Sequence, residues 1–244
     1  MMRVSTPPAQ EFSVRRSARA RRVRLTVSSS GEVVVVLPQR ASLTHAARLV
    51  AQHQRWLDRH LARVRLERSR LAARPRLGEG RWLFIAGEAT RISAVDAVTR
   101  RPARGRVEAA SGGLIVRLGR DGRETAALLE TWLRDRARRE IGGRIVARAA
   151  EMGVQPGRLS IRDQSSRWAS ASASGALSFS WRLILTPPFV LDAVVVHELA
   201  HLLVRGHDRR FWSIVRSYAP RTDEARRWLR AHAREVREAL DEAA

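Results

Sequence analysis

The 244-residue chain contains no cysteine, which excludes disulfide bonds and metal sites made of thiolates. Lysine and asparagine are also absent, so all 46 basic residues are arginine and the formal net charge is +22 at pH 7. No apolar run approaches the roughly 20 residues that a membrane-spanning helix needs, and residues 1–10 lack the hydrophobic stretch of a signal segment. The sequence therefore predicts a globular, cytoplasmic protein without a membrane partner.

The arginine excess has two interpretations. A strongly positive chain meets polyanions faster, and each phosphate that it neutralises releases counterions. The use of arginine alone, with abundant alanine, also fits a coding bias that leaves arginines on solvated faces. The densest cluster is the best candidate for phosphate contact and consists of Arg15, Arg16, Arg19, Arg21, Arg22 and Arg24. Nucleic acid therefore stays open as a partner.

Three histidines and a glutamate fall within eleven residues, in the segment His-Glu-Leu-Ala-His at 197–201 and at His207. Helix positions four apart share one face, so His197 and His201 can bind the same metal ion. Glu198 lies about 100° around the helix axis, which suits a general base better than a ligand. Gly206 allows the chain to turn back after the helix, which makes His207 the candidate third ligand.

Three neutral imidazoles leave the fourth position of a tetrahedral site for water, as in catalytic zinc sites. One zinc ion per chain would lower the pKa of water toward ~7. Glu198 would take the proton as that water attacks a carbonyl and return it to the leaving amine. The sequence thus predicts metal-assisted hydrolysis.

Several other side chains are weaker candidates for this site. Arg182, Arg167 and Tyr218 could stabilise the oxyanion. If His207 were not a ligand, Asp208 or Glu224 would be the next to consider. The remaining histidines are expected to be surface or packing residues, and they are His45, His53, His60 and His232.

Hydrophobic periodicity predicts an α+β fold. A β-hairpin is expected at residues 23–37 with its turn at 28–31, and a helix of about 25 residues begins after Ser42. Short strands follow at 82–85, 89–95 and 114–118, which we expect to form antiparallel sheet. A long helix over 123–151, strands at 159–161 and 177–185, a loop at 165–175 and the histidine helix after Pro188 complete the pattern. Two domains are predicted, at residues 1–118 and 119–244.

The stretch from Ser166 to Trp212 resembles the YgjP-like metallopeptidases, which are similar in turn to the SprT-like and Wss-type zincin proteases. The matching segments are Arg-Trp-Ala-Ser at 167–170, residues 177–188, residues 194–201, and residues 207–212. The resemblance implies a zincin-like domain with the HExxH helix under a small antiparallel sheet, preceded by a β-rich region with a long helix. It also implies His197, His201 and His207 as zinc ligands and Glu198 as the catalytic residue.

Two departures from the family pattern lie before the histidine helix. The family usually has glycine and cysteine where Ala169 and Ala171 stand, and asparagine where Ser180 stands. In zincins a peptide commonly lies extended along an edge strand above the metal helix, and we expect residues 177–185 to be that strand.

Three functions remain in competition at the level of the sequence. The favoured one is a zinc-dependent peptidase that acts on a protein or peptide. The second is a metal-dependent hydrolase of phosphoanhydrides or nucleotides, because the same activated water can attack phosphorus. The third is a nucleic-acid-associated protein with a metal site. The sequence does not define the oligomeric state.

Overall fold

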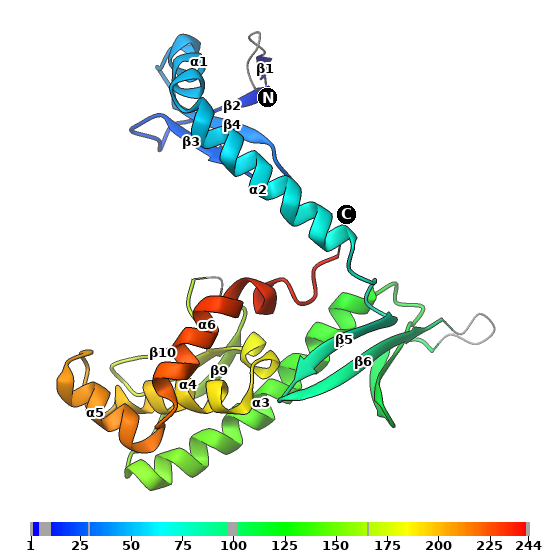
Figure 1. Ribbon diagram of the computed structural model, residues 1–244, viewed down its shortest axis with the longest axis vertical. Coiled ribbons are helices and arrows are strands. Elements are labelled where there is room, and N and C mark those ends of the chain that lie inside the picture. Colours follow the sequence, from blue (N-terminus) through cyan, green and yellow to red (C-terminus); the bar gives the residue numbers. More distant parts are fainter. Residues whose placement is uncertain (1, 5–10, 29, 97–101, 165, 243–244) are drawn as a thin grey trace. The chain divides into compact units, whose positions relative to one another are not determined.

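The computed structural model describes residues 2–4, 11–28, 30–96, 102–164 and 166–242 (Figure 1). The chain divides into two compact units, Met1–Arg74 and Pro75–Glu242, and each has its own hydrophobic core. The boundary predicted between residues 118 and 119 lies inside the second unit, because Leu83, Ile92 and Val116 join the core of the later helices. Within the described residues, no helix is both long enough and apolar enough to cross a bilayer.

The first unit contains a four-stranded sheet in the order β1-β2-β4-β3. These strands are β1 (Met2–Val4), β2 (Phe12–Ser17), β3 (Arg24–Val27) and β4 (Val33–Pro38). The predicted hairpin is confirmed, because β3 and β4 pair antiparallel. Its predicted turn includes residue 29, which lies outside the described residues. Strand β2 adds to β4 in parallel.

The helix predicted after Ser42 is two helices, α1 (Leu43–Gln52) and α2 (Gln54–Ala72). Ser42 is the N-cap, as expected, and its side chain accepts a hydrogen bond from the Thr44 N–H. His53 interrupts the helix with φ −109° and ψ 18°, which lies outside the helical range. The periodicity of apolar residues continues across this break, so it did not indicate where α1 ends.

The second unit begins with another four-stranded sheet, in the order β5-β6-β8-β7. Its strands are β5 (Glu79–Ile85), β6 (Glu88–Val95), β7 (Arg106–Ala110) and β8 (Gly113–Arg117). Three of them confirm predicted strands, whereas β7 was not predicted. The expectation of antiparallel pairing throughout is wrong for β6 and β8, which are parallel. The chain first forms β7 at the sheet edge and then reverses into β8, so β8 runs in the direction of β6.

The hairpin between β5 and β6 is fixed against the segment that precedes the histidine helix. Ala86 and Gly87 have φ of 53° and 92°, and positive φ at both central residues is the requirement of a type I′ turn. The Ala86 N–H donates to the Ile184 carbonyl oxygen at 2.7 Å. A Cβ at position 87 would lie 2.7 Å from the Pro188 ring, so this approach requires glycine.

A long helix and a small sheet form the frame around the histidine segment. Helix α3 (Thr125–Met152) confirms the prediction and packs against α4 (Pro188–Ala200) and the 3₁₀ helix η1 (Trp181–Leu185) (Figure 1). The sheet has the order β10-β11-β9, from β10 (Ala169–Ala171), β11 (Leu177–Ser180) and β9 (Leu159–Arg162). It is mixed, because β11 pairs antiparallel with β10 and parallel with β9.

The strand predicted over residues 177–185 ends at Ser180. The Ser180 hydroxyl accepts a hydrogen bond from the Arg182 N–H at 3.3 Å and caps η1. Ile184, which strict alternation would place on the solvent face, is 0% exposed. A segment that is buried on both of its presumed faces loses the two-residue period, and the apolar pattern alone did not separate a strand from a helical turn.

Two further helices complete the second unit. They are α5 (Arg209–Tyr218) and α6 (Thr222–Arg237), and both contact α4. Helix α4 is therefore in contact with α3, α5 and α6 and with strand β10.

Candidate metal centre

Helix α4 carries the first part of the centre. Pro188 is its first residue, where a missing N–H does no harm. Val190, Leu191, Val195 and Val196 are buried, so the burial of this apolar stretch, rather than its intrinsic helix propensity, holds the helix. His197 lies in the last turn of α4, and His201 is its C-cap residue. The helix thus presents both imidazoles at its C-terminal end.

His207 reaches the same place from the connection between α4 and α5. The next residue, Asp208, is the N-cap of α5 and accepts a hydrogen bond from the Phe211 N–H at 2.8 Å. The cap fixes where α5 starts and hence where the residue before it lies. His201 Nδ1 lies 3.3 Å from the Val204 carbonyl oxygen. In the tautomer that donates this bond, Nε2 is free to accept a metal ion.

The three imidazoles converge. One nitrogen from each of His197, His201 and His207 lies within 4.8 Å of the other two, and the Nε2 atoms of His197 and His207 are 3.2 Å apart. Two imidazole nitrogens bound to a tetrahedral zinc ion at ~2.0–2.1 Å would be separated by ~3.3 Å. The donor set and this spacing therefore fit a zinc-sized cation.

The protonation of the cluster favours metal binding. Burial, together with the neighbouring charges of His201, His207 and Arg226, lowers the pKa of His197 to about 4. Burial also lowers the pKa of His201, against the effect of the Val204 carbonyl. Because metals bind the neutral imidazole, these two ligands need not release a proton at pH 7.

Glu198 is buried beside the cluster. Burial raises the pKa of its carboxyl to about 7, while the backbone N–H of Ala171, which donates to it, and the charge of Arg167 act in the opposite direction. A nearby divalent cation would favour the ionised form further. Glu198 thus combines access to the cluster with a pKa near neutrality.

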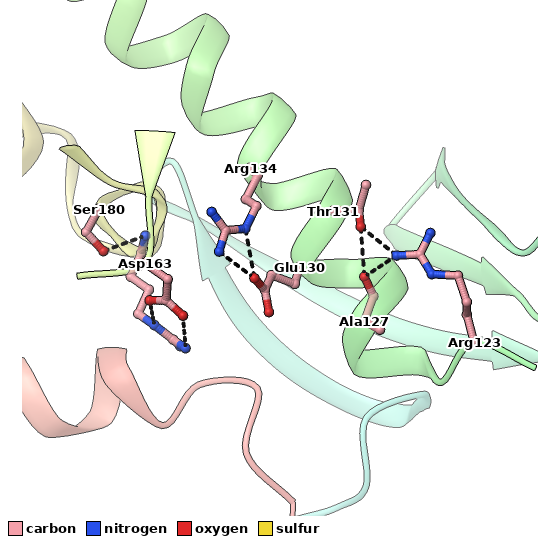
Figure 2. Close-up of polar contacts among 8 residues, drawn as sticks. Arg123, Ala127, Glu130, Thr131, Arg134, Asp163 and Ser180 are labelled. Carbon is pink, nitrogen blue, oxygen red and sulfur yellow. Dashed lines mark hydrogen bonds and ion pairs between the residues drawn. The ribbon is translucent and has the colours of Figure 1, made fainter. Parts of the chain in front are cut away.

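The three residues considered for oxyanion stabilisation differ in their surroundings. Asp163, which is labelled in Figure 2, accepts two hydrogen bonds from Arg182, at 3.0 and 3.2 Å. The Arg182 guanidinium lies 4.4 Å from the centre of the Trp181 ring. Tyr218 is half-buried against the core. Of the three, Arg167 is the residue whose charge acts on Glu198. Arg182 is therefore engaged in holding η1, and Arg167 is the better candidate.

The substitutes considered for the third ligand are occupied elsewhere. Asp208 caps α5, and Glu224 accepts two hydrogen bonds from Arg221, at 2.7 and 2.8 Å. Outside the cluster, His232 stacks on Trp228 and His60 stacks on Trp56, with ring centres 4.3 and 4.5 Å apart. Within the described residues, His197, His201 and His207 are the group placed to share a metal ion.

The edge strand beside the centre is not the predicted one. Strand β11 lies in the middle of its sheet, bonded on both sides, whereas β10 is at the edge. Ala169 and Ala171 of β10 occupy two of the positions that depart from the family pattern. The backbone N–H of Ala171 donates a hydrogen bond to the Glu198 carboxyl. The expectation that residues 177–185 receive an extended peptide is therefore wrong, because β11 has no free edge and residues 181–185 are helical.

Two features of the site were not predicted. The Phe211 ring packs on all three imidazoles, with ring centres 4.6–4.9 Å away. Asp192 of α4 accepts hydrogen bonds from Arg148 of α3 at 2.6 and 3.0 Å. A lone aspartate in the apolar run at 190–196 was a signal for the second feature, but one sequence does not identify its partner.

A comparison with protein families identifies the family of this chain. The profile of the YgjP-like metallopeptidase domain matches residues 21–232, and a search of curated proteins gave no match. The crystal structure of the metallopeptidase zymogen of Pyrococcus abyssi abylysin is 22% identical, with a TM-score of 0.36, and covers 38% of this chain and 96% of that chain. The corresponding zymogen of Methanocaldococcus jannaschii jannalysin is 17% identical, with a TM-score of 0.35 and the same coverage. The family match spans most of the sequence, so the chain belongs to the YgjP-like metallopeptidase family and is a metal-dependent peptidase.

Proposed function

We propose that this protein hydrolyses amide bonds of proteins or peptides with one zinc ion held by His197, His201 and His207 and with Glu198 as general base. The observation that carries the proposal is the convergence of three imidazole nitrogens within 4.8 Å next to a buried carboxyl. Imidazole suits zinc among several transition metals, and the cluster contains neither a thiolate nor a carboxylate ligand. Three protein ligands leave a position for solvent or substrate.

The chemistry is divided between the ion and the protein. When bound, zinc acts as a Lewis acid toward the substrate carbonyl and lowers the pKa of water toward ~7. Glu198 takes a proton from the attacking water and delivers it to the leaving amine. Burial raises the pKa of this carboxyl, which favours its holding the proton between the two transfers, while the bound cation favours the ionised form that accepts it.

The test pairs elemental analysis with a single substitution. Purified protein should contain one zinc per chain and cleave an unfolded protein substrate, and a chelator should stop cleavage until zinc is restored. Glu198→Gln should lower kcat by ~10²–10⁴ without loss of zinc or of helical circular dichroism. Glu235→Gln, on the exposed surface of α6, is the matched control.

Two outcomes would contradict the assignment. One is turnover by Glu198→Gln equal to that of the wild type, which removes the general base. The other is chelator-sensitive hydrolysis of nucleoside triphosphates without cleavage of any polypeptide, which would favour the phosphoanhydride hydrolase.

A second function, contact with nucleic acid, is favoured by one observation in the first unit. A trough of about 640 Å³ is lined by Arg15, Arg19, Arg21, Arg22 and Arg24, and none of the described residues that line it is acidic. Arg16, which the sequence grouped with them, instead donates to the carbonyl oxygens of Gln39 and Ala41 at 2.7 and 2.9 Å. Concentrated arginines without carboxylates suit a phosphate backbone.

Salt dependence tests this second function. The full chain should bind duplex DNA with an affinity that falls with salt, and Arg21→Gln with Arg22→Gln should reduce the slope of log K against log salt by ~0.9 for each lost phosphate contact. Arg63→Gln on the exposed face of α2 is the control. A slope that the double substitution leaves unchanged would exclude the trough as the contact surface.

A further inference from the structure

A cavity of about 230 Å³ lies directly beside the metal centre. We call it the α4–α6 cavity, because those two helices form most of its wall. Helix α4 contributes Ala193, Val194, His197 and Glu198, helix α6 contributes Thr222, Ala225, Arg226 and Leu229, and Trp168, Ala169 and Trp212 complete the lining.

The spacing of these residues shows that the cavity is built by two facing helix surfaces. On α6 the lining positions are 222, 225, 226 and 229, which is the three-and-four spacing of one helix face. Two of the lining side chains are small, Ala193 of α4 at 4% exposure and Ala225 in the first turn of α6 at 1%. Larger side chains at these two positions would fill the space between the helices.

The cavity is not a sealed packing defect. Trp168, Val194, Trp212 and Leu229 are only partly buried, so the cavity reaches the surface of the second unit. Its lining includes the Glu198 and His197 side chains. A group that enters it therefore lies next to the residues assigned to catalysis.

We propose that the α4–α6 cavity is a specificity pocket that binds one apolar side chain of the polypeptide substrate, on a residue adjoining the bond that is cleaved. The proposal rests on the proposed peptidase function. The walls of the cavity are mostly aromatic and aliphatic, and burial of apolar surface supplies the binding free energy.

The size and charge of the cavity define which side chains fit. Apolar protein cavities of ~150 Å³ accept a benzene molecule, so about 230 Å³ accepts the side chain of phenylalanine, leucine or methionine. The Arg226 guanidinium lies 4.4 Å from the centre of the Trp212 ring and places a positive charge in the lining. Lysine and arginine side chains are therefore disfavoured by the cost of removing their charge from water into a largely apolar cavity.

The test uses zinc-loaded full-length protein and a set of peptides that differ at one residue. We expect kcat/KM for phenylalanine or leucine at the preferred position to exceed that for glycine or lysine by at least ~10-fold, the lower range of pocket discrimination. Ala225→Leu should narrow the pocket and lower kcat/KM for the phenylalanine peptide by ~10-fold or more, with little effect on an alanine peptide. Leu229→Ala should widen it and improve cleavage of a tryptophan peptide. Ala231→Leu, at an exposed position of the same helix, is the control.

A binding measurement separates the pocket from catalysis. In the Glu198→Gln background, calorimetric titration with the same peptides should rank their affinities in the same order as their kcat/KM values. Adding Ala225→Leu should weaken the binding of the phenylalanine peptide selectively. If no peptide is cleaved by the zinc-loaded wild type, the proposed function fails. The proposal of a specificity pocket is overturned if peptides are cleaved without a preference for apolar side chains. It is also overturned if Leu229→Ala and a folded Ala225→Leu leave that preference unchanged. Should Ala225→Leu not fold, Leu229→Ala decides.

Discussion

Burial tunes His197 and Glu198 of the metal centre, whereas His207 is exposed. The Phe211 ring lies within 5 Å of all three imidazole centres. Burial lowers the pKa of His197 and raises that of Glu198, so both groups favour their uncharged forms until a cation is bound. Binding of a divalent ion then reverses the preference of the carboxyl, because opposite charges attract strongly at low dielectric.

Substitution of His207 tests whether this residue is the third zinc ligand. His207→Ala removes one of three nitrogens, and we expect zinc affinity to fall by at least ~100-fold, because even changes behind the ligands cost 10–100-fold. Competition titration with a chromogenic chelator measures this. His45→Ala, at an exposed position of α1, should retain wild-type affinity. Unchanged affinity in His207→Ala would mean that another group is the third ligand.

At the scale of elements, α4 is held against α3 by a charged pair. Arg148 donates two hydrogen bonds to Asp192, and the Asp192 side chain is 18% exposed. Two parallel bonds between a guanidinium and a carboxylate fix orientation as well as distance. The pair therefore sets the position of the helix that carries the histidines.

Loss of this pair should destabilise the second unit. Arg148→Ala leaves Asp192 without its main partner, and we expect the free energy of unfolding to fall by ~1–3 kcal/mol in urea titrations. The double substitution Arg148→Ala with Asp192→Ala should cost less than the sum of the single ones. Arg136→Ala breaks the more accessible pair with Glu140 on the same helix and should cost only ~0.3–0.5 kcal/mol. Equal effects for both arginines would contradict the special role of Arg148.

A second ion pair makes the stability of η1 depend on pH. Burial alone would raise the pKa of Asp163, but the hydrogen bond and charge of Arg182 outweigh it and lower the pKa below its usual value. The folded state therefore binds the proton more weakly than the unfolded state. The resulting stability is present above the unfolded pKa of ~3.9 and is lost as the pH falls through the lowered folded value.

Asp163→Asn tests this linkage. The difference in unfolding free energy between wild type and variant should be full at pH 6 and should shrink as the pH falls below ~3.9. Thermal or urea unfolding at a series of pH values measures it. A difference that stays constant over this range would show that Asp163 does not act through its charge.

At the scale of the whole molecule, the two hydrophobic cores are separate, and all three histidines belong to the second unit. A ligand that binds only the folded state stabilises it by about 2.7 kcal/mol at a concentration of 100 Kd. Metal binding should therefore act on one unit and not on the other.

Calorimetry before and after metal removal tests whether the metal stabilises only the second unit. A chelator should lower the Tm of the transition of the second unit and leave that of the first unit in place, so that the two transitions separate or move relative to one another. Restored zinc should reverse the shift. A single transition that moves as a whole would show that the two units unfold together.

The sequence by itself determined the features that depend on local spacing. The hairpin of residues 23–37, the N-cap at Ser42, helix α3 and the sharing of one helix end by His197 and His201 all follow from turn chemistry, capping and helix periodicity. The turn allowed by Gly206 made His207 the candidate third ligand, and the family resemblance implied the same residue.

Only the tertiary structure decided how distant segments combine. The parallel pairing of β6 with β8, the change from strand to 3₁₀ helix at Trp181, the edge position of β10 and the bond from Ala171 to Glu198 arise from contacts between residues far apart in the chain. The α4–α6 cavity depends on small side chains that line it from two helices, Ala193 of α4 and Ala225 of α6. Hydrophobic periodicity reports which face of an element is buried, but not which other element covers it, and the latter choice forms the site.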